Sequence, residues 1–372
     1  MAERRVRVAV LGTRGIPDVM GGVETHCQAL YPRLVAKGHT VTLFARAGYV
    51  AQKEPYTFNG VQVVPIWAPL RKSLEAICQT SWGIIRIARQ RSRYDLVHIH
   101  AIGPSLLIPF ARLLGLPVIM THHGPDYDRQ KWGKLAKTIL RLGEKLGCLY
   151  ASRVITVSQH IRSCIKKLYS CNGTYIPNGV PIPELLPPGN AIQKWGISAG
   201  HYILTIGRLV PEKGFHDLIA AYKSIETDWN LVIAGAADHE DEYSINLKQL
   251  AAEEPRIVMT GFIKGAELGE ILSNAGLFIL PSYHEGLPIA LLEAMSYNLP
   301  IIASDIPANC ELARPTETFP VGNVEALRKK ISEFITSSAL EQNTRKRVET
   351  EFDWDVVAEA TERVYLEAVR GL

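Results

Sequence analysis

Two glutamates carry the strongest chemical signal in the chain. Glu285 and Glu293 stand in the segment LPSYHEGLPIALLEAM with seven residues between them. The apolar residues 276–282 predict a buried strand, and an apolar helix should follow, with Pro288 in its first turn. We expect Glu285 at the mouth of this strand–helix turn and Glu293 two turns into the helix, on the same face. Because a helix N-terminus attracts anions and carboxylates accept hydrogen bonds from hydroxyls, the segment predicts a sugar-nucleotide site.

A second segment supplies positive charge. ILTIGRLVPEKG predicts a strand that ends at Arg208, and Lys213 follows five residues later, beside Gly214. Two cations near the carboxyl end of a strand suit a diphosphate whose charge must be neutralised as it leaves. Taken alone, the glutamates could be an ordinary helix face and the cations a solvated surface pair. The two segments together favour the site.

The residues resemble a known family. EGLPIALLE is similar to the E-x7-E motif of retaining glycosyltransferases of family 4, and GRLVPEKG is similar to their donor-phosphate motif. GTRGIPDVMGGVETH resembles the N-terminal glycine loop of the family, MTHHGPD its T-x-H-G-x-D segment, and YIPNGV its crossover between domains. Five motifs in the right order and spacing extend the resemblance over nearly the whole chain.

The resemblance implies a role for each of these residues. Arg208 and Lys213 would bind the donor diphosphate, Glu293 would accept hydrogen bonds from the ribose, and Glu285 would face the donor sugar. The other positions implied for donor binding are Gly21, Gly22, Phe262, Gly286 and Leu287. The two glycines of the N-terminal loop let the backbone approach a phosphate, and the backbone at position 262 would contact the base. Many members have glycine where this chain has Pro288, which cannot donate an N–H, so neighbouring residues must supply the donors.

The histidines of the first half fall into two groups. His123 matches the family histidine near the reacting sugar, where it could donate to a sugar hydroxyl or to developing charge. His122 is adjacent, but the following Gly124 favours His123. His98 and His100 lie on a predicted strand and are interpreted as structural or cleft-lining.

The chain also contains an Asp-x-Asp pair. Asp126 and Asp128 would hold a divalent metal in another class of glycosyltransferase. Here Asp126 matches the aspartate of the T-x-H-G-x-D segment, so we interpret the pair as a chance match. We expect neither a metal requirement nor a cofactor beyond the nucleotide diphosphate sugar itself.

Strands and helices alternate along the chain, which predicts parallel sheets covered on both faces. The resemblance implies a GT-B fold: two Rossmann-like domains facing a cleft. We expect an acceptor-binding domain over residues 1–178, a donor-binding domain over 179–354, and a C-terminal helix, 355–372, that packs back on the first. The proline-rich stretch 176–190 is the predicted linker. Pro32 should kink or break the helix that precedes Gly38.

The cysteine content and the distribution of charge indicate the cellular location and the kinds of partner to expect. The six cysteines form no metal-binding spacing, so we expect reduced thiols in a cytoplasmic protein. The chain enters an apolar strand close to its start, which predicts no signal peptide. Residues 1–178 hold 25 Lys and Arg against 9 Asp and Glu, whereas residues 179–372 hold 16 against 28. Such a split suggests different partners for the two halves.

The basic half contains two amphipathic segments. Residues 128–150 place Trp132, Leu135, Ile139, Leu142 and Leu146 on one helical face. The cations Lys131, Lys134, Lys137, Arg141 and Lys145 gather on a neighbouring face, and Arg86, Arg89, Arg91 and Arg93 mark a similar stretch earlier. We expect the apolar stripe to face the domain core and favour an anionic membrane surface for the cations. No nucleic-acid motif accompanies the charge.

The predicted reaction is transfer of a sugar from a nucleotide diphosphate sugar to an acceptor hydroxyl, with retention of anomeric configuration. The segment GTRGIP followed by GGVET resembles a subset that builds bacterial surface polysaccharides, including rhamnosyltransferases. A lipid-linked saccharide acceptor at the inner face of the cytoplasmic membrane would fit. The alternatives are a sugar-nucleotide epimerase or glycogen-type phosphorylase of the same architecture, and a sugar-nucleotide-binding protein without turnover.

Overall fold

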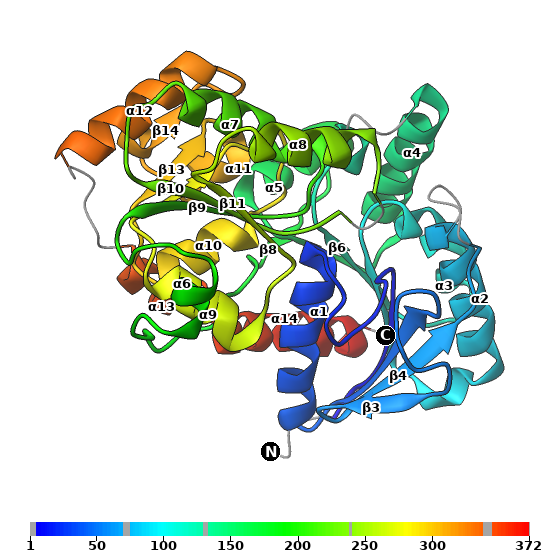
Figure 1. Ribbon diagram of the computed structural model, residues 1–372. Coiled ribbons are helices and arrows are strands. Elements are labelled where there is room, and N and C mark those ends of the chain that lie inside the picture. Colours follow the sequence, from blue (N-terminus) through cyan, green and yellow to red (C-terminus); the bar gives the residue numbers. More distant parts are fainter. Residues whose placement is uncertain (1–4, 70–74, 129–132, 238–239, 338–343, 372) are drawn as a thin grey trace. The chain divides into compact units, whose positions relative to one another are not determined.

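The structure is a computed structural model that describes residues 5–69, 75–128, 133–237, 240–337 and 344–371. The chain divides into two compact units. The first unit comprises Met1–Gly179 and Trp354–Leu372, and the second comprises Val180–Asp353. The division after Gly179 falls within the stretch 176–190 that the sequence marks as a linker. Both units are layered α/β structures built on largely parallel sheets (Figure 1).

The first unit contains an 8-stranded sheet with the order β3-β4-β2-β1-β5-β6-β7-β8. Its strands are β1 (Arg7–Leu11), β2 (Thr40–Arg46), β3 (Tyr56–Phe58), β4 (Val61–Ile66), β5 (Leu96–His100), β6 (Val118–His122), β7 (Arg153–Thr156) and β8 (Thr174–Tyr175). β1 and β5 are buried over most or all of their length, because helices cover both faces of the sheet.

One strand pair departs from the predicted parallel arrangement. β3 and β4 pair antiparallel through a hairpin at Asn59 and Gly60. Both residues have positive φ, 45° and 83°. The dipeptide Asn-Gly is a strong hairpin signal because these two residues tolerate that backbone conformation. The Asn-Gly dipeptide is therefore a sequence signal for the turn. Strand β3 itself has only three residues, which is too short for its apolar pattern to predict it.

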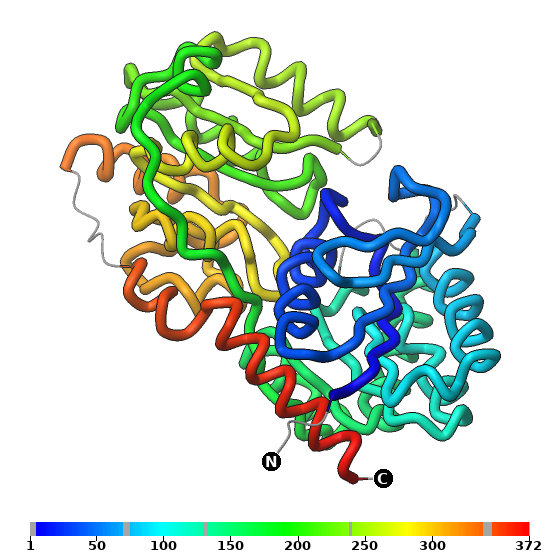
Figure 2. The backbone as a smooth tube through the Cα atoms, turned by 90° about the horizontal axis from the view of Figure 1, so that it is seen from below, coloured from blue at the N-terminus to red at the C-terminus, as the bar shows by residue number. Residues whose placement is uncertain are grey.

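The helices of the first unit are α1 (Gly22–Ala36), α2 (Glu75–Arg89), α3 (Ile108–Arg112), α4 (Lys134–Tyr150), α5 (Gln159–Tyr169) and α14 (Trp354–Arg370). α14 packs against α1, and both contribute to one core with the sheet. Figure 2 shows this C-terminal helix, in red, beside the N-terminal segment in blue. Leu30 and Leu34 from α1 and Val357 and Tyr365 from α14 are buried in this core.

Of the kink or break predicted at Pro32, the break does not occur, because α1 runs from Gly22 to Ala36 through this residue. Its neighbours Leu30, Tyr31 and Leu34 are fully buried, so packing of the helix face holds the chain in place. The guanidinium of Arg33 donates to the carbonyl oxygen of Ala29 at 2.9 Å. The helix ends as predicted, with Gly38 at φ 94° after Lys37.

The second unit contains a 6-stranded parallel sheet with the order β11-β10-β9-β12-β13-β14. Its strands are β9 (Tyr202–Ile206), β10 (Asn230–Ala234), β11 (Ile257–Gly261), β12 (Leu277–Leu280), β13 (Ile301–Ser304) and β14 (Thr318–Phe319). Its helices are α6 (Asn190–Lys194), α7 (Phe215–Lys223), α8 (Glu242–Ala252), α9 (Gly265–Ser273), α10 (Ile289–Ser296), α11 (Pro307–Cys310), α12 (Val324–Ser337) and α13 (Arg345–Glu351). The strand order reverses between β9 and β12, the place where sheets of this kind bind ligands.

None of the helices in the described part of the chain combines the length and apolar character needed to cross a bilayer.

Candidate active site

The carboxyl ends of the central strands in the second unit are drawn close together by glycines. Gly207 donates its N–H to Ala234 at 3.0 Å, and Gly235 donates to Gly261 at 2.8 Å. A Cβ on Gly235 would lie 1.8 Å from the carbonyl oxygen of Gly207, so no other residue fits there. These contacts fix the loops that follow β9, β10 and β11.

The turn that carries Lys213 is tied to the end of β12. Gly214 has φ 65°, and a Cβ on it would lie 2.2 Å from the carbonyl oxygen of Pro281. The N–H of Tyr283 donates to the carbonyl oxygen of Glu212 at 2.8 Å. The glycine allows the two loops to touch, and the hydrogen bond locks them together. The two motifs of the sequence, 72 positions apart from Gly214 to Gly286, thus share one location.

Lys213 and Glu285 form an ion pair at this location. The Lys213 ammonium donates to Oε1 of Glu285 at 2.6 Å, and the Ser282 hydroxyl donates to the same oxygen at 2.7 Å. Both charged side chains are largely buried. Burial acts to raise the pKa of Glu285, but the Lys213 charge and the two hydrogen bonds outweigh it and leave that pKa below its usual value. Glu285 is therefore an ionised acid held in a fixed position.

A network of buried polar side chains holds the backbone of Ser282 in place. The Ser304 hydroxyl donates to the carbonyl oxygen of Ser282 at 2.5 Å. The Asn309 side-chain amide donates to both the carbonyl and the hydroxyl oxygen of Ser304, each at 3.0 Å. Ser304 and Asn309 are fully buried. Sequence reasoning missed these supporting residues, and the only available signal was a serine at the end of an apolar strand.

Glu293 lies nearer to the helix start than predicted. α10 begins at Ile289, and Pro288 occupies its N-cap with an extended backbone. Glu293 is the fifth helical residue, just over one turn in, because residues 285–287 are not helical. Burial raises the pKa of Glu293 to about 7. This acid is therefore poised between its two protonation states at neutral pH.

The remaining predicted donor-site residues lie on the same loops. Arg208 is half-buried and follows β9 by one residue. Phe262 directly follows β11 and its side chain is 50% exposed. Gly286 and Leu287 connect Glu285 to the start of α10, with the Leu287 side chain buried. Each belongs to a loop at the carboxyl end of a strand, which is where ligands of open parallel sheets bind.

In the first unit, His123 belongs to a cluster of imidazoles. It follows β6 and is half-buried, and its Nε2 lies 2.9 Å from Nδ1 of His100 in a hydrogen bond. The ring of His26 stands edge-on to both, with centroids 5.0 Å from His123 and 5.6 Å from His100. His100 was interpreted from sequence as structural or cleft-lining, and the structure shows it holding His123.

Further hydrogen bonds fix the outer side of the cluster. His26 Nδ1 lies 3.0 Å from the side-chain oxygen of Asn178, and His100 Nε2 lies 2.5 Å from the Tyr31 hydroxyl. The Tyr31 hydroxyl lies 3.1 Å from Nδ1 of His98. His98 is itself bonded to the hydroxyls of Tyr365 at 2.6 Å and Thr121 at 2.7 Å. His98 is therefore a structural residue of the core.

Burial keeps these imidazoles neutral. It lowers the pKa of His26 to about 4 and that of His98 to about 3. Burial, reinforced by the neighbouring imidazoles, lowers the pKa values of His100 and His123 well below the usual range. A neutral His123 can donate or accept a hydrogen bond but brings no positive charge.

His122 has a different environment from its neighbour. Its Nε2 lies 2.8 Å from Glu144 and its Nδ1 accepts the N–H of Gly124 at 3.2 Å, so both ring nitrogens are engaged. Glu144 also accepts from the hydroxyls of Tyr127 and Tyr169. His122 is locked inside the unit, while His123 turns towards His26 and His100.

The glycine loop after β1 packs against the carboxylate of Glu24. Gly21 has φ 148° at the N-cap of α1, and a Cβ on it would lie 2.2 Å from a carboxylate oxygen of Glu24. The other oxygen of Glu24 accepts the N–H of Arg14 at 2.9 Å. The structure thus requires glycine at position 21 for a local reason. Gly22 has no heavy atom within 4 Å of a Cβ position.

Comparisons with known proteins agree with this geometry. The model "Glycosyltransferase Family 4" matches residues 20–183, and "Glycosyl transferases group 1" matches residues 190–351. The chain belongs to glycosyltransferase family 4. Its relatives include the Escherichia coli UDP-Gal:alpha-D-GlcNAc-diphosphoundecaprenol alpha-1,3-galactosyltransferase, which is 31% identical over 59% of this chain and 60% of that protein. This family 4 protein is accordingly a glycosyltransferase that uses a nucleotide-sugar donor.

Solved structures confirm the GT-B fold of this glycosyltransferase. Sucrose-phosphate synthase from Thermosynechococcus elongatus superposes with a TM-score of 0.86 at 21% identity, covering 99% of this chain and 100% of that one. HepE from Anabaena, solved in complex with UDP and glucose, gives a TM-score of 0.80 at 19% identity, covering 98% and 100%.

The basic helix of this glycosyltransferase departs in part from expectation, because only some of the described residues of the apolar stripe of α4 turn towards the core. Leu135 and Leu142 of this stripe are 76% and 46% exposed, whereas Ile139 and Leu146 are half-buried. Leu149, which is not part of the stripe, is 53% exposed. The helix packs instead through Gly143 and Gly147, where a Cβ would lie 2.2 Å from the carbonyl oxygen of Ile102 and 2.3 Å from the sulfur of Met120. Two glycines four residues apart form a flat face that brings the backbone against the unit and leaves Leu135 and Leu142 on the outer side.

The cations predicted beside this stripe line the same exposed helix. Lys134, Arg141 and Lys145 are exposed, and Lys137 is half-buried. The Arg141 guanidinium lies over the ring of Tyr127, 5.0 Å from its centroid. Lys131 and Trp132 lie outside the described residues. α4 thus presents leucines and cations side by side on the surface of the glycosyltransferase.

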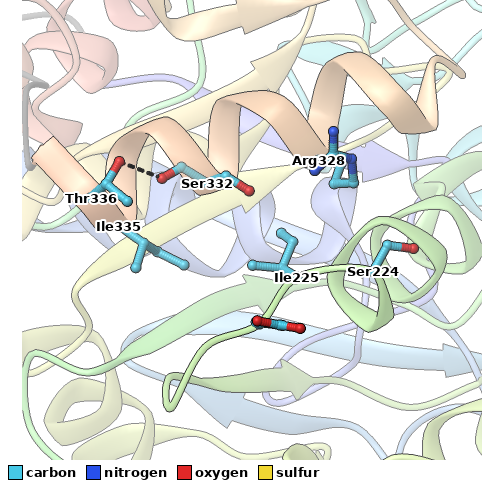
Figure 3. A pocket seen from close by; sticks show the side chains of 7 residues that line it. Ser224, Ile225, Arg328, Ser332, Ile335 and Thr336 are labelled. Carbon is cyan, nitrogen blue, oxygen red and sulfur yellow. Dashed lines mark hydrogen bonds between the residues drawn. The ribbon is translucent and has the colours of Figure 1, made fainter.

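A pocket of this glycosyltransferase lies beyond the C-terminal end of α7, away from Lys213 of the predicted donor site. Figure 3 shows the side chains that line it. Ile225, Arg328 and Ile335 are among the residues that line it, from the end of α7 and from α12. Lys213 precedes the start of α7, so the helix separates the two places. We assign the pocket no part in the reaction.

Proposed function

We propose that the protein transfers the sugar of a nucleotide diphosphate sugar to an acceptor hydroxyl and retains the anomeric configuration. The observation that carries this proposal is the buried Lys213–Glu285 ion pair at the carboxyl ends of β9 and β12. A charged pair held in a fixed position is what an electrostatic catalyst of diphosphate departure needs. Family membership supports the donor class.

The proposed roles follow from charge and position. Lys213 and Arg208 neutralise the diphosphate as the bond from its oxygen to the anomeric carbon breaks. The departing oxygen takes the proton of the acceptor hydroxyl, which attacks from the same face and so retains configuration. Glu285 accepts hydrogen bonds from the sugar, and Glu293 accepts them from the ribose. Neutral His123 donates a hydrogen bond to a hydroxyl of the reacting sugar.

We infer a lipid-linked saccharide as the acceptor. The Escherichia coli relative is named for a diphosphoundecaprenol-linked acceptor, and it matches 59% of this chain. The exposed surface of α4, with Leu135, Leu142 and Leu149 beside its cations, supports docking on an anionic membrane that presents such a lipid. This arrangement would make the protein peripheral at the inner face of the cytoplasmic membrane.

Release of nucleotide diphosphate tests the reaction. We expect release from one activated sugar to rise strongly when a lipid-linked saccharide acceptor is added. A thermal-shift screen against UDP-, GDP- and dTDP-sugars selects the donor first, because a bound ligand stabilises the fold by mass action. Stable donor binding without release under any acceptor would identify a binding protein without turnover and contradict the proposal.

Liposome flotation tests the membrane surface. We expect the protein to float with anionic vesicles and not with neutral ones. Replacing two exposed leucines of α4, Leu135→Ser with Leu142→Ser, should reduce the bound fraction about tenfold or more, since each leucine stabilises membrane contact by roughly 1 kcal/mol or more. The matched control is Leu168→Ser with Leu185→Ser, two leucines that are also exposed but lie outside α4. Equal binding by both double variants would contradict the assignment of α4.

We propose that the reaction requires no metal. The chemistry assigned above places the positive charge on Arg208 and Lys213, so a divalent cation has no necessary role. Transfer activity should persist in EDTA. Complete loss of activity that Mn²⁺ or Mg²⁺ restores would contradict this expectation and return Asp126 and Asp128 to consideration.

A further inference from the structure

His26, His100 and His123 form a group that we call the histidine triad. One ring nitrogen of each lies within 4.8 Å of a ring nitrogen of the other two. We propose that the histidine triad binds a transition-metal dication such as Zn²⁺, and that the bound metal inhibits transfer by occupying His123. The inhibitory half rests on the function proposed above, whereas the binding half does not.

The orientation of the rings assigns one nitrogen of each to the metal. The Nδ1 of His26 lies 3.0 Å from the Asn178 side-chain oxygen, which leaves Nε2 available. The Nε2 of His100 lies 2.5 Å from the Tyr31 hydroxyl, which leaves Nδ1. Histidines that ligate metals usually have their second nitrogen hydrogen-bonded in this way, because the outer partner fixes the ring and its tautomer.

The inner nitrogens are spaced closely enough for one ion. His100 Nδ1 and His123 Nε2 lie 2.9 Å apart in a hydrogen bond. Nitrogens bound to one tetrahedral Zn²⁺ at about 2.0–2.1 Å are separated by roughly 3.4 Å. Small rotations of the side chains would let one metal ion take the place of the proton between these two nitrogens. The proton moves to the other nitrogen of its ring, so each imidazole stays neutral.

The ligand type selects the metal. Three imidazoles and no carboxylate favour Zn²⁺, Cu²⁺ or Ni²⁺ over Mg²⁺ or Ca²⁺, which prefer oxygen. His123 is half-buried, and three protein ligands would leave the fourth position of a tetrahedral metal for water. The other two rings are buried and held by Asn178 and Tyr31.

Occupation of the histidine triad has a direct consequence for the reaction. A metal takes the lone pair of the His123 nitrogen and fixes the ring towards His26 and His100. His123 then cannot turn to a sugar hydroxyl. The metal therefore acts as an inhibitor, which agrees with the proposal that the reaction requires no metal.

Calorimetric titration of the full-length, EDTA-treated protein with Zn²⁺ tests binding. We expect one tight site in the wild type. His26→Gln should weaken it at least about tenfold, and Asn178→Ala should weaken it about 10- to 100-fold by releasing the outer nitrogen of His26. The matched control is His160→Gln, since His160 Nε2 lies 3.5 Å from Cys164 Sγ in an exposed pair that could bind zinc by itself. This control should titrate like the wild type.

Two results would overturn the site. The first is that the wild type binds Zn²⁺ no more tightly than His26→Gln does. The second is that the wild type has a tight site which is lost in His160→Gln. Should His26→Gln fail to fold, Asn178→Ala and the absorption spectrum of the Co²⁺-loaded wild type decide the matter. A spectrum of six-coordinate Co²⁺ bound only by oxygen would contradict the histidine triad.

Inhibition is measured separately. Zn²⁺ at the concentration that saturates the site should reduce transfer at least about tenfold in both the wild type and His160→Gln. Unchanged transfer at saturation would overturn the inhibitory half. Tight Zn²⁺ binding in a protein that transfers no sugar would instead leave the site intact and refute the proposed function.

Discussion

The ion pair between Lys213 and Glu285 joins the two sequence motifs of the second unit. Its 2.6 Å contact places a cation and an acid at one point, supported by Ser282. Breaking a buried pair leaves the other charge without compensation, so each partner depends on the other. In the proposed reaction, a bound diphosphate would give Lys213 a second anionic partner without moving this side chain from solvent.

Replacing Lys213 tests its role at the residue scale. Lys213→Ala should reduce kcat/KM by a factor that corresponds to about 3 kcal/mol or more, since one strong electrostatic donor is lost. Lys223→Ala is the matched control, because Lys223 forms a more exposed pair with Glu253 at 2.7 Å. Near-normal kcat/KM in Lys213→Ala would remove this residue from the mechanism.

Glu293 predicts a pH-dependent stability. Its pKa of about 7 in the folded protein lies above the usual value of 4.5. The folded state therefore holds a proton that the unfolded state has lost, and stability declines as the pH rises from about 4.5 to 7. Glu293→Gln cannot ionise, so it should gain roughly 3 kcal/mol relative to the wild type between pH 5 and pH 8.

Urea unfolding at pH 5 and pH 8 measures this difference. Glu333→Gln is the matched control, an exposed glutamate of the same unit that pairs loosely with Lys329 at 3.8 Å. It should show no comparable gain. A Glu293→Gln protein whose stability follows the wild type at both pH values would show that this carboxyl titrates normally.

At the scale of elements, α4 depends on its glycine face. A Cβ at Gly143 would lie 2.2 Å from a backbone oxygen, so Gly143→Ala should push the helix outward. Overpacking of this kind destabilises by about 1–3 kcal/mol. Gly133→Ala, at the N-cap of the same helix with no heavy atom within 4 Å, should change stability by no more than about 0.5 kcal/mol.

Urea unfolding of the two variants, followed by circular dichroism, checks this prediction. Equal midpoints for Gly143→Ala and Gly133→Ala would mean that α4 does not pack closely at Gly143. The orientation of the leucine stripe would then lose its structural basis.

The elements of the chain follow closely from its sequence. Apolar runs predicted the central strands, such as β1, β5 and β12, because parallel strands are buried on both faces. The short strands β3, β8 and β14 were missed, since two or three residues carry no periodicity. The stripe on α4 was placed correctly only in part, because periodicity identifies a shared face but does not say which face packs, and glycines decided that here.

The candidate site was predictable in part. Glu285 and Lys213 were identified from charge and spacing, but their direct pairing depends on the close approach that Gly214 permits. Ser304 and Asn309 carry no signal in the sequence, because buried polar residues of this kind are recognised only by their partners. The histidine triad draws on positions 26, 100 and 123, which only the fold brings together.

At the scale of the whole molecule, charge and fold divide in the same way. The first unit contains the basic half of the sequence and the exposed helix α4, and the second contains the ion pair and Glu293. Donor chemistry and membrane contact are thus assigned to different units. Variants in α4 should change membrane binding, and variants around Lys213 should change turnover on a water-soluble acceptor, each without the other effect.

A crystal soaked with the nucleotide diphosphate sugar chosen by thermal shift tests the central claim most directly. We predict the diphosphate against Arg208 and Lys213, the ribose hydroxyls against Glu293 and the sugar against Glu285. A donor bound elsewhere, or one that leaves these four side chains without contact to it, would contradict the account.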